Sequence, residues 1–208
     1  MAQNDPPQIV FATKNDHKLK EISEIMGGSG FSLVSMRKAG IDADIEEIGE
    51  TFEQNALIKA EEVAKLTGKP SMADDSGLVI DHLNGAPGIY SARYLGEDTP
   101  YEIKNKKILE MMNGVPLEKR SARFVCAIAF VWFDNQNEKI ILTTEAKMEG
   151  FIAYEAAGIN GFGYDPIFWL PDYGMTSAQL ESSVKNKISH RGCALRLMNE
   201  KLLQLFKT

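Results

Sequence analysis

The pattern of hydrophobic and polar positions predicts alternating strands and helices in the first third of the chain. Residues 8–13 (QIVFAT) are almost entirely apolar, which is typical of a short buried strand, and residues 31–35 predict a second strand. Between these strands, hydrophobic residues recur every three or four positions, which predicts an amphipathic helix. The buried face of that helix would carry Leu19, Ile22, Ile25 and Met26.

A second helix is expected after an acidic loop at residues 36–50. It would begin at Thr51, because Gln54 three residues later completes a capping box. Gly68, with Pro70 close behind it, would end this helix. Its buried stripe would consist of the small side chains Ala56, Ala60, Val63 and Ala64.

The rest of the chain predicts more strands, including one long hairpin. Residues 71–73 form a short apolar run, residues 74–77 (DDSG) are typical of a tight acidic turn, and residues 78–83 predict another strand. Two long strands follow at residues 120–134 and 138–148. The remaining elements are a helix at 99–112, a strand at 167–170 and a final amphipathic helix that buries Leu195, Met198, Leu202 and Leu205. Interleaved strands and helices predict an α/β fold with a mixed sheet.

Length and composition fit a globular protein with a single domain over residues 1–208, of which residues 1–7 would be a flexible start. The longest apolar run, Phe124–Phe133, has ten residues and is too short to cross a membrane, and the N-terminus lacks the pattern of a secretion signal. The two cysteines cannot form a disulfide framework or a four-ligand zinc site, so a reducing, cytoplasmic location is expected. A net charge of -6 argues against broad binding to nucleic acid but permits a small anionic ligand.

The first candidate site is the segment Thr13–Glu21, where a predicted strand leads into a predicted helix. A helix N-terminus presents unpaired N–H groups and a partial positive charge, which together bind phosphate. Thr13 or Asn15 could cap this helix, and Lys18 lies one turn further on, where its ammonium could reach a phosphate oxygen. The alternative is a capped surface helix whose lysines are solvated.

The second candidate is the pair Asp74 and Asp75. Two adjacent carboxylates are costly to desolvate together, and a bound divalent cation is the usual compensation. A metal-bound carboxylate can also orient or deprotonate water, whereas the alternative is a turn whose acids face solvent. Asn55 and Lys59 share one helix face, which points either to the same site or to solvent. The acidic loop could add a further metal ligand from Glu46, Glu47 and Glu50.

Two more candidates lie in the last quarter of the chain. Residues 161–166 (GFGYDP) place glycines around an aromatic ring, so that the ring can stack on a flat ligand; the alternative is a tight loop with a core phenylalanine. Lys185 and residues 189–192 (SHRG) offer cations and an imidazole at the start of the last helix. For His190 alone, a structural role is the ordinary interpretation.

Taken together and in this order, the motifs resemble those of the inosine triphosphate pyrophosphatase family. The resemblance extends from about residue 8 to residue 206 and does not depend on any single motif. Lys14 is a departure, since many members have glycine there. The matching segments are 13–21 (TKNDHKLKE), 51–60 (TFEQNALIKA), 73–78 (ADDSGL), 85–94 (GAPGIYSARY), 161–168 (GFGYDPIF) and 188–192 (ISHRG).

This resemblance implies an enzyme that hydrolyses ITP, dITP and XTP to the nucleoside monophosphate and pyrophosphate. It implies Mg²⁺ as the cofactor and a homodimer as the usual assembly, with neither nucleic acid nor a membrane as a partner. The implied fold is a long, curved mixed β-sheet flanked by helices, in two lobes with the active cleft between them.

The resemblance also implies roles for individual residues. Asp75 would be the catalytic carboxylate and a metal ligand, with Glu47 as the second ligand, a place that Glu46 or Glu50 could take instead. Ser76 would touch the nucleotide. The triphosphate would be cradled by Thr13, Lys14, Asn15, Asp16, His17 and Lys18. The base would be bound by Phe162, Gly163, Tyr164, Asp165, Lys185, His190 and Arg191, with the Phe162 ring stacked on the purine.

In the implied reaction, water attacks the α-phosphorus and pyrophosphate leaves. Mg²⁺ and Lys18 would offset charge on the phosphate oxygens, while Asp75 positions or deprotonates the water. Donors aimed at the 6-oxo group of the base would reject adenine, which carries an amino group at that position.

The sequence permits two alternatives to this function. One is a Maf-type pyrophosphatase that acts on modified pyrimidine or other nucleotides; the Phe162 loop and the Ser-His-Arg motif count against it. The other is a nucleotide-binding regulator or DNA-associated protein without catalysis. The presence of Lys18, Glu47 and Asp75, together with the negative net charge, counts against this second alternative.

Overall fold

The computed structural model describes residues 8–14 and 16–206, with the backbone alone of Asp16 and His17. Residues 1–7, for which the sequence predicts a flexible start, lie outside the described residues. The strands are β1 (Gln8–Phe11), β2 (Ser32–Ser35), β3 (Ser71–Ile80), β4 (Ser121–Phe133), β5 (Lys139–Ile152), β6 (Phe168–Leu170) and β7 (Met175–Thr176). The α-helices are α1 (Asp16–Ile25), α2 (Phe52–Thr67), α3 (Tyr101–Met111), α4 (Ser182–Ile188) and α5 (His190–Leu205).

The strands of the described part of the chain form a single seven-stranded sheet. Its order is β2-β1-β3-β4-β5-β6-β7. β1 runs parallel to both β2 and β3, whereas β6 runs antiparallel to both β5 and β7. The sheet is therefore mixed, and the predicted α/β class is confirmed.

The chain forms two compact units, each with its own core. Unit 1 comprises Met1–Asp75, Cys126–Ala146 and Arg191–Thr208, and unit 2 comprises Ser76–Val125 and Lys147–His190. The three long strands β3, β4 and β5 each contribute residues to both units. A domain prediction based on length does not reveal this division, because the boundaries fall inside continuous strands.

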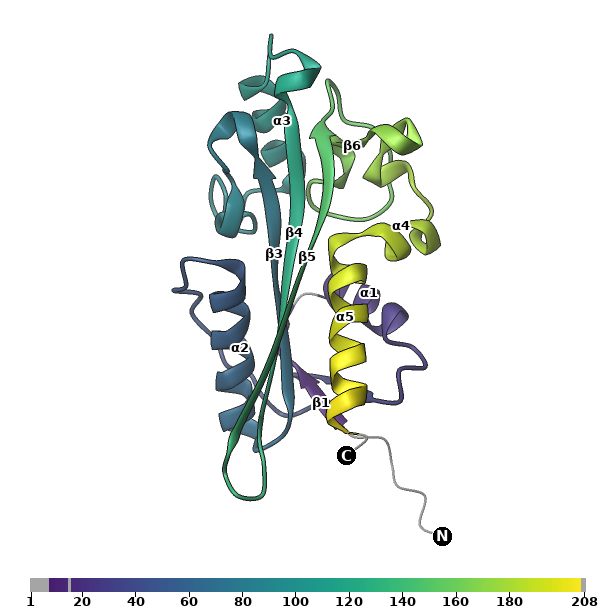
Figure 1. Cartoon of the computed structure of the whole chain (residues 1–208). Helices are drawn as coiled ribbons and strands as arrows, with labels where there is room; N and C mark the ends of the chain where they lie inside the picture. Colours follow the sequence, from purple (N-terminus) through teal and green to yellow (C-terminus); the bar gives the residue numbers. More distant parts are fainter. Residues whose placement is uncertain (1–7, 15, 207–208) are drawn as a thin grey trace. The chain divides into compact units, whose positions relative to one another are not determined.

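Unit 1 is a sheet covered by helices on both faces. Figure 1 shows α2 on one side of this part of the sheet and α1 with α5 on the other. Ile128 and Phe130 of β4 pack in a cluster with residues of α1 and α5, whereas Ala127 and Ala129 pack in a cluster with residues of α2. This division follows from the strand itself, because successive side chains point to opposite faces. Cys126 is fully buried in the first cluster.

The helix α2 begins and ends where the sequence predicts. The Thr51 side chain accepts a hydrogen bond from the Gln54 N–H (3.1 Å), and Gly68 closes the helix in the left-handed conformation with φ of 64°. The Gln54 side chain accepts a hydrogen bond from the Glu50 N–H (2.7 Å), one residue before the position that a capping box would use. The predicted stripe is buried, and it consists of Ala56, Ala60, Val63 and Ala64.

Unit 2 has one core cluster, in which α3 and β6 pack with residues of β3, β4 and β5. Arg120 is an unusual member of this interior, since its side chain is only 2% exposed. Its guanidinium donates hydrogen bonds of 2.6–3.2 Å to the backbone carbonyls of Met112, Val115, Ile152 and Ala153. One buried side chain therefore ties the end of α3 to the end of β5.

The acidic segment Asp74–Gly77 is not a turn, and this prediction is wrong. It lies inside β3, which runs without interruption over ten residues. Burial of the two acids is tolerated because cationic side chains lie beside them, from α1 and α5 for Asp74 and from α2 for Asp75. These partners are distant in the sequence, so local pattern reasoning treats the acids as solvated.

The sequence places Lys185 at the start of the last helix, and this placement is also wrong. Lys185 belongs to the short helix α4, which ends at Ile188, and Ser189 is extended. The long helix α5 then begins at His190, so His190 and Arg191 occupy its N-terminus as predicted.

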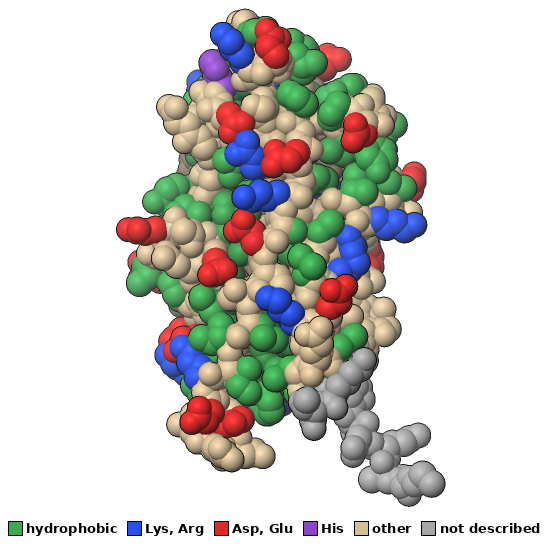
Figure 2. Space-filling model, viewed as in Figure 1, with side chains coloured by type: hydrophobic (Ala, Val, Ile, Leu, Met, Phe, Trp, Pro, Cys, Tyr) green, Lys and Arg blue, Asp and Glu red, His purple; other side chains and the backbone are tan. Residues whose placement is uncertain are grey.

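Charged side chains of both signs are interspersed on the face shown in Figure 2, with hydrophobic side chains among them. Lysine and arginine side chains do not form a continuous basic surface on this face. None of the helices within the described residues has the length and apolar character needed to span a membrane.

Replacing Arg120 by Met is expected to lower the free energy of unfolding by at least about 3 kcal/mol. The substitution removes the guanidinium donor from four buried carbonyls, of which Met112 keeps the Val115 N–H at 3.2 Å, and each group left unsatisfied costs about 1–3 kcal/mol. Urea denaturation followed by tryptophan fluorescence measures the change. The control Arg123→Met removes a partly exposed arginine of the following strand β4, whose surface ion pairs contribute less than about 1 kcal/mol. Equal losses in the two variants would contradict a special role of Arg120.

Candidate active site

Asp75 is the centre of a polar cluster on the α2 side of β3. Its carboxylate lies 3.8 Å from the Lys59 ammonium and accepts a hydrogen bond of 3.1 Å from the Asn55 amide. Glu47 of the acidic loop contacts the same ammonium at 2.5 Å. Asn55 and Lys59 belong to α2 and both face this cluster, so the alternative of a solvated polar face is wrong.

The electrostatic environment of Asp75 is suited to proton transfer. Burial raises the pKa of Asp75 to about 6; the Lys59 charge opposes this rise and the Glu47 charge adds to it. Burial by itself would lower the pKa of Lys59, but the charges of Asp75, Asp74 and Glu47 raise it above the ordinary lysine value. A carboxylate with a pKa near 6 is a stronger base than an exposed aspartate and is still largely ionised at neutral pH.

Among the three acids considered as a second metal ligand, the geometry favours Glu47. Its side chain is partly buried and shares Lys59 with Asp75, whereas Glu46 and Glu50 are exposed. Within the described residues no group of three or more His, Cys, Asp or Glu side chains is arranged to hold a metal ion. Two carboxylates nevertheless fit Mg²⁺, which is commonly bound by one or two protein carboxylates together with substrate phosphates.

Asp74 lies on the opposite face of β3, in a second cluster. Its side chain is 1% exposed, and its Oδ2 atom lies 3.1 Å from the Lys18 ammonium and 3.3 Å from the Arg191 guanidinium. Arg191 also donates a hydrogen bond to Glu21. Burial would raise the pKa of Asp74, but Lys18 and Arg191 hold it well below the usual aspartate range. Asp74 is therefore a fixed anion that orients two cations.

The predicted triphosphate segment is described only in part. Asn15 lies outside the described residues, and nothing is described of the Asp16 and His17 side chains. Thr13 precedes α1, and Lys14 extends toward the acidic loop, where its ammonium lies 3.7 Å from Asp42 and 3.5 Å from Asp44. The helix α1 begins at Asp16, so this segment does supply a helix N-terminus, as the phosphate hypothesis requires.

In unit 2, the predicted aromatic loop is organised by the buried carboxylate of Asp165. This carboxylate, 3% exposed, accepts hydrogen bonds from the Phe162 N–H (2.8 Å), the Ser177 hydroxyl (2.9 Å) and the Lys185 ammonium (2.6 Å). Gly161 has φ of 72°, and a Cβ atom there would lie 2.2 Å from Asp165 Oδ2. The glycine is thus required by the close approach of this carboxylate.

The ring of Phe162 is half-buried, with the Lys185 ammonium 5.3 Å from its centroid. Tyr164, in contrast, is a core residue: its hydroxyl donates to the Ser91 carbonyl (2.8 Å) and its ring packs edge-on against Tyr101. Asp165 and Lys185 are therefore held as an internal ion pair that supports the loop, while Phe162 keeps a ring surface accessible to a ligand.

Asn105 is a supporting residue that sequence reasoning missed. Its amide, on α3, donates a hydrogen bond of 3.0 Å to the backbone carbonyl of Gly163, and its side chain is buried. An asparagine inside a helix is a weak helix former, which is the only local signal that it serves another purpose. Glu21 of the first motif is a second supporting residue, since it accepts a hydrogen bond from Arg191, and its sequence position alone does not predict this role.

The remaining predicted residues are placed as follows. His190 is buried and stacks on Phe124 with ring centroids 4.9 Å apart, a contact inside unit 2. Arg191, the next residue, makes its described ion pairs inside unit 1, with Asp74 and Glu21. Ser76 follows Asp75 in β3 and is partly buried.

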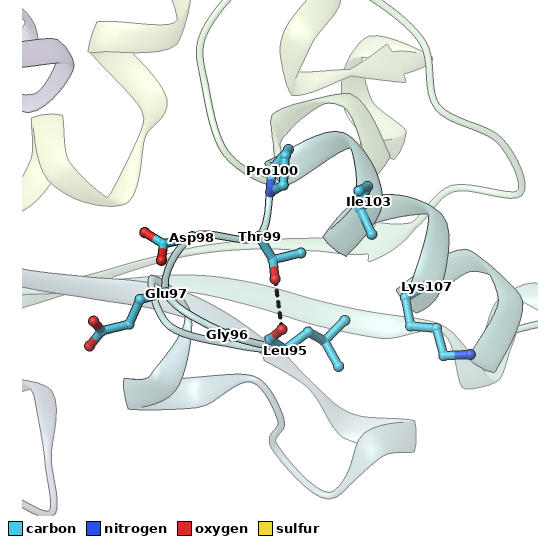
Figure 3. A pocket seen from close by; sticks show the side chains of 8 residues that line it. All are labelled: Leu95, Gly96, Glu97, Asp98, Thr99, Pro100, Ile103 and Lys107. Carbon is cyan, nitrogen blue, oxygen red and sulfur yellow. Dashed lines mark hydrogen bonds between the residues drawn. The ribbon is translucent and has the colours of Figure 1, made fainter.

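An open pocket in unit 2 is separate from these residues. Figure 3 shows that it is formed by the loop before α3 and the first turns of that helix. No residue predicted to bind substrate lines it, and Glu97 and Asp98 would repel an anionic ligand. Its lining consists of Leu95, Gly96, Glu97, Asp98, Thr99, Pro100, Ile103 and Lys107.

In this mixed α/β fold, carboxylates and lysines lie beside a loop that leads from a strand into a helix. This arrangement is typical of proteins that bind phosphorylated ligands. Residues 9–201 match the Ham1 family, and the chain belongs to that family. This result confirms the resemblance that the motifs predict.

Individual relatives agree with this assignment. A dITP/XTP pyrophosphatase of Bacillus licheniformis is 46% identical over 197 residues, which cover 95% of this chain and 98% of the relative. A HAM1 protein from Coxiella burnetii has a similar structure, with a TM-score of 0.85 and 41% identity over 95% of this chain and 99% of that protein. The Staphylococcus aureus Ham1 protein gives a TM-score of 0.81 and 39% identity, covering 94% of this chain and 97% of that protein.

The substitution Asp165→Asn is expected to destabilise unit 2 by about 3–5 kcal/mol, because it leaves the buried Lys185 ammonium without its counter-charge. Hydrogen exchange of residues 158–166 should also become faster, since the Phe162 N–H loses a strong acceptor. Urea denaturation and exchange mass spectrometry measure the two effects. The control Glu110→Gln removes an exposed pair with Lys107 and is expected to change stability by no more than about 0.5 kcal/mol. Unchanged stability of Asp165→Asn would contradict the proposed support.

Proposed function

We propose that this protein is a Mg²⁺-dependent nucleoside triphosphate pyrophosphatase that hydrolyses ITP, dITP and XTP to the monophosphate and pyrophosphate. Such an activity would remove non-standard purine nucleotides from the nucleotide pool. Relatives named dITP/XTP pyrophosphatase support the proposal, including those of Bacillus licheniformis and Bacillus subtilis, each 46% identical. The structural observation that carries it is the buried Asp75 carboxylate, whose pKa is raised to about 6 beside Lys59 and Glu47.

Asp75 and Glu47 would hold the metal ion. When bound, Mg²⁺ offsets negative charge on phosphate oxygens and acidifies a bound water. Asp75 would accept the proton of the attacking water at its carboxylate. Lys59 would keep both acids ionised, because its positive charge reduces their mutual repulsion.

The phosphate groups would be bound by Lys18 and the backbone N–H groups at the start of α1. Residues 13–17 would line the same phosphate site. The ion pair with Asp74 supports this role, since it holds the Lys18 ammonium in place before a ligand arrives. A preorganised cation needs less rearrangement when charge develops on the phosphate oxygens.

The base would stack on Phe162, in the loop that also includes Gly163, Tyr164 and Asp165. The Lys185 ammonium near this ring supports a preference for a 6-oxo purine, because its positive charge suits an acceptor and disfavours the amino group of adenine. His190, at the N-terminus of α5, would contact the edge of the base. For Arg191, its pairs with Asp74 and Glu21 support a role beside Lys18.

We also propose a homodimer located in the cytoplasm. The segment from residue 90 to residue 111 supports a self-interface, because it exposes the large hydrophobic side chains Tyr90, Leu95, Tyr101, Ile103 and Met111. Both cysteines are free thiols, which supports a reducing compartment. Light scattering on the purified protein measures the assembly.

The decisive test is hydrolysis of ITP, XTP, GTP, ATP and dUTP with Mg²⁺, with pyrophosphate and single phosphate measured separately. We expect pyrophosphate from ITP and XTP, little reaction of ATP and GTP, and loss of activity when EDTA removes the metal. Pyrophosphate from pyrimidine nucleotides alone would favour the Maf-type alternative. No release from any nucleotide would favour a non-catalytic binding protein.

The substitution Asp75→Asn is expected to lower kcat at least about 100-fold while nucleotide binding persists, because it keeps the shape of the side chain and removes its basicity. Glu47→Gln is expected to raise the Mg²⁺ concentration needed for half-maximal rate. Steady-state kinetics over a Mg²⁺ series measures both effects.

The controls for this pair are Glu46→Gln and Glu50→Gln, which remove exposed acids of the same loop and are expected to leave the Mg²⁺ dependence unchanged. A stronger effect in either control than in Glu47→Gln would reassign the second ligand. Normal turnover of Asp75→Asn would show that another residue has the catalytic role, and Asp74 would be the first residue to test.

A further inference from the structure

The side chain of Asn55 connects two parts of the cluster that Lys59 also joins, the strand with Asp75 and the loop with Glu47. Asn55 lies in the first turns of α2 and is 0% exposed. Its amide NH₂ donates a hydrogen bond of 3.1 Å to Asp75 Oδ2, and its carbonyl oxygen accepts one of 2.8 Å from the Gly49 N–H. One buried amide thus contacts both Asp75 in β3 and Gly49 in the acidic loop.

This pair of hydrogen bonds calls for an amide at position 55. An ionised carboxylate such as Asp75 only accepts hydrogen bonds, and a backbone N–H only donates. The connecting group must therefore donate on one side and accept on the other within a short side chain. Aspartate could satisfy the Gly49 side but would place a second negative charge against Asp75, and an aliphatic residue could satisfy neither.

The loop is also shaped to receive this amide. A Cβ atom at Gly49 would lie 2.7 Å from Asn55 Oδ1 and 2.7 Å from the Gln54 Cβ, so the contact requires glycine. The neighbouring Glu50 N–H is bound by the Gln54 side chain at 2.7 Å. Two consecutive backbone N–H groups of the loop are thus bound by side chains of α2, and Glu47 lies two residues before the first of them.

We propose that Asn55 is a positioning residue that holds Asp75 and the Glu47 loop in one fixed arrangement. Without it, the repulsion between the two carboxylates favours their separation, which the positive charge of Lys59 opposes. The neutral amide fixes both parts without adding charge. This inference rests on the proposed function for its kinetic consequences, whereas its structural consequence at Gly49 does not.

The test compares Asn55→Asp, Asn55→Ala and the control Gln54→Ala. In Asn55→Asp, kcat for ITP is expected to fall at least about tenfold, the range for losing a hydrogen bond to a charged group, while KM for ITP stays within about threefold. The Gly49 amide should remain slow to exchange with solvent, because the new carboxylate still accepts its hydrogen bond. In Asn55→Ala, kcat should fall and Gly49 exchange should become at least about tenfold faster.

Gln54→Ala removes the neighbouring hydrogen bond between α2 and the loop, at the Glu50 N–H, and leaves the Asn55 bond to Asp75 in place. Its kcat is expected to stay within about threefold of the wild type, which separates the positioning of Asp75 from a general loosening of the loop. Gly49→Ala approaches from the loop side and is expected to lower kcat as Asn55→Asp does, because its Cβ cannot fit against the Asn55 oxygen. Exchange at single amides is followed by NMR, and thermal unfolding confirms that each variant is folded.

Wild-type kcat in Asn55→Asp or in Gly49→Ala would overturn the proposal. So would unchanged Gly49 exchange in Asn55→Ala, or a loss that appears in KM alone, which would make Asn55 a substrate-binding residue. If the wild-type protein does not hydrolyse ITP, the proposed function fails, and the Gly49 exchange rates still decide whether Asn55 holds the loop. If Asn55→Ala does not fold, Asn55→Asp and Gly49→Ala carry the test.

Discussion

The alternation of side chains along one buried strand determines the chemistry of unit 1. Asp74 and Asp75 are adjacent in β3 and therefore face opposite sides of the sheet. Asp74 meets two cations, which hold its pKa far below the usual range, whereas Asp75 meets one lysine and a second acid, and its pKa rises to about 6. Two identical residues thus acquire the distinct properties of a permanent anion and a base from the faces on which they lie.

In both units, buried polar side chains bind the backbone of loop segments. Asn55 binds the acidic loop, Asp165 binds the N–H of Phe162, and Asn105 binds the carbonyl of Gly163. In each case a segment that would meet a ligand is positioned by a side chain that is itself buried. A rigid interior therefore determines the geometry of the segments that carry function, which are themselves poor in regular structure.

Much of the fold could be predicted because the relevant signals are local. The cap at Thr51 and the small-residue stripe of α2 depend on residues within one helix, and each strand of the long hairpin is one continuous run of strand-forming residues. The acidic segment of β3 could not be predicted in this way, because the cations that permit its burial come from α1, α2 and α5. The same reason hides Asn105, whose partner Gly163 is 58 residues away. Motif resemblance supplied the candidate residues, but only the structure separates those with an accessible surface, such as Phe162, from those that are buried supports, such as Tyr164.

The placement of Asp74 and Asp75 in mid-strand also limits how this gene can change. A deletion of one codon between the start of β3 and these acids would place Asp75 beside the two cations, and an insertion of one codon would place Asp74 beside Lys59 and Glu47. Most sheets tolerate changes of length in the turns between their strands. Here, however, the alternation of side chains that places Asp74 and Asp75 on opposite faces begins at Ser71. The segment from Ser71 to Asp75 can therefore vary in the identity of its side chains while its length remains constant.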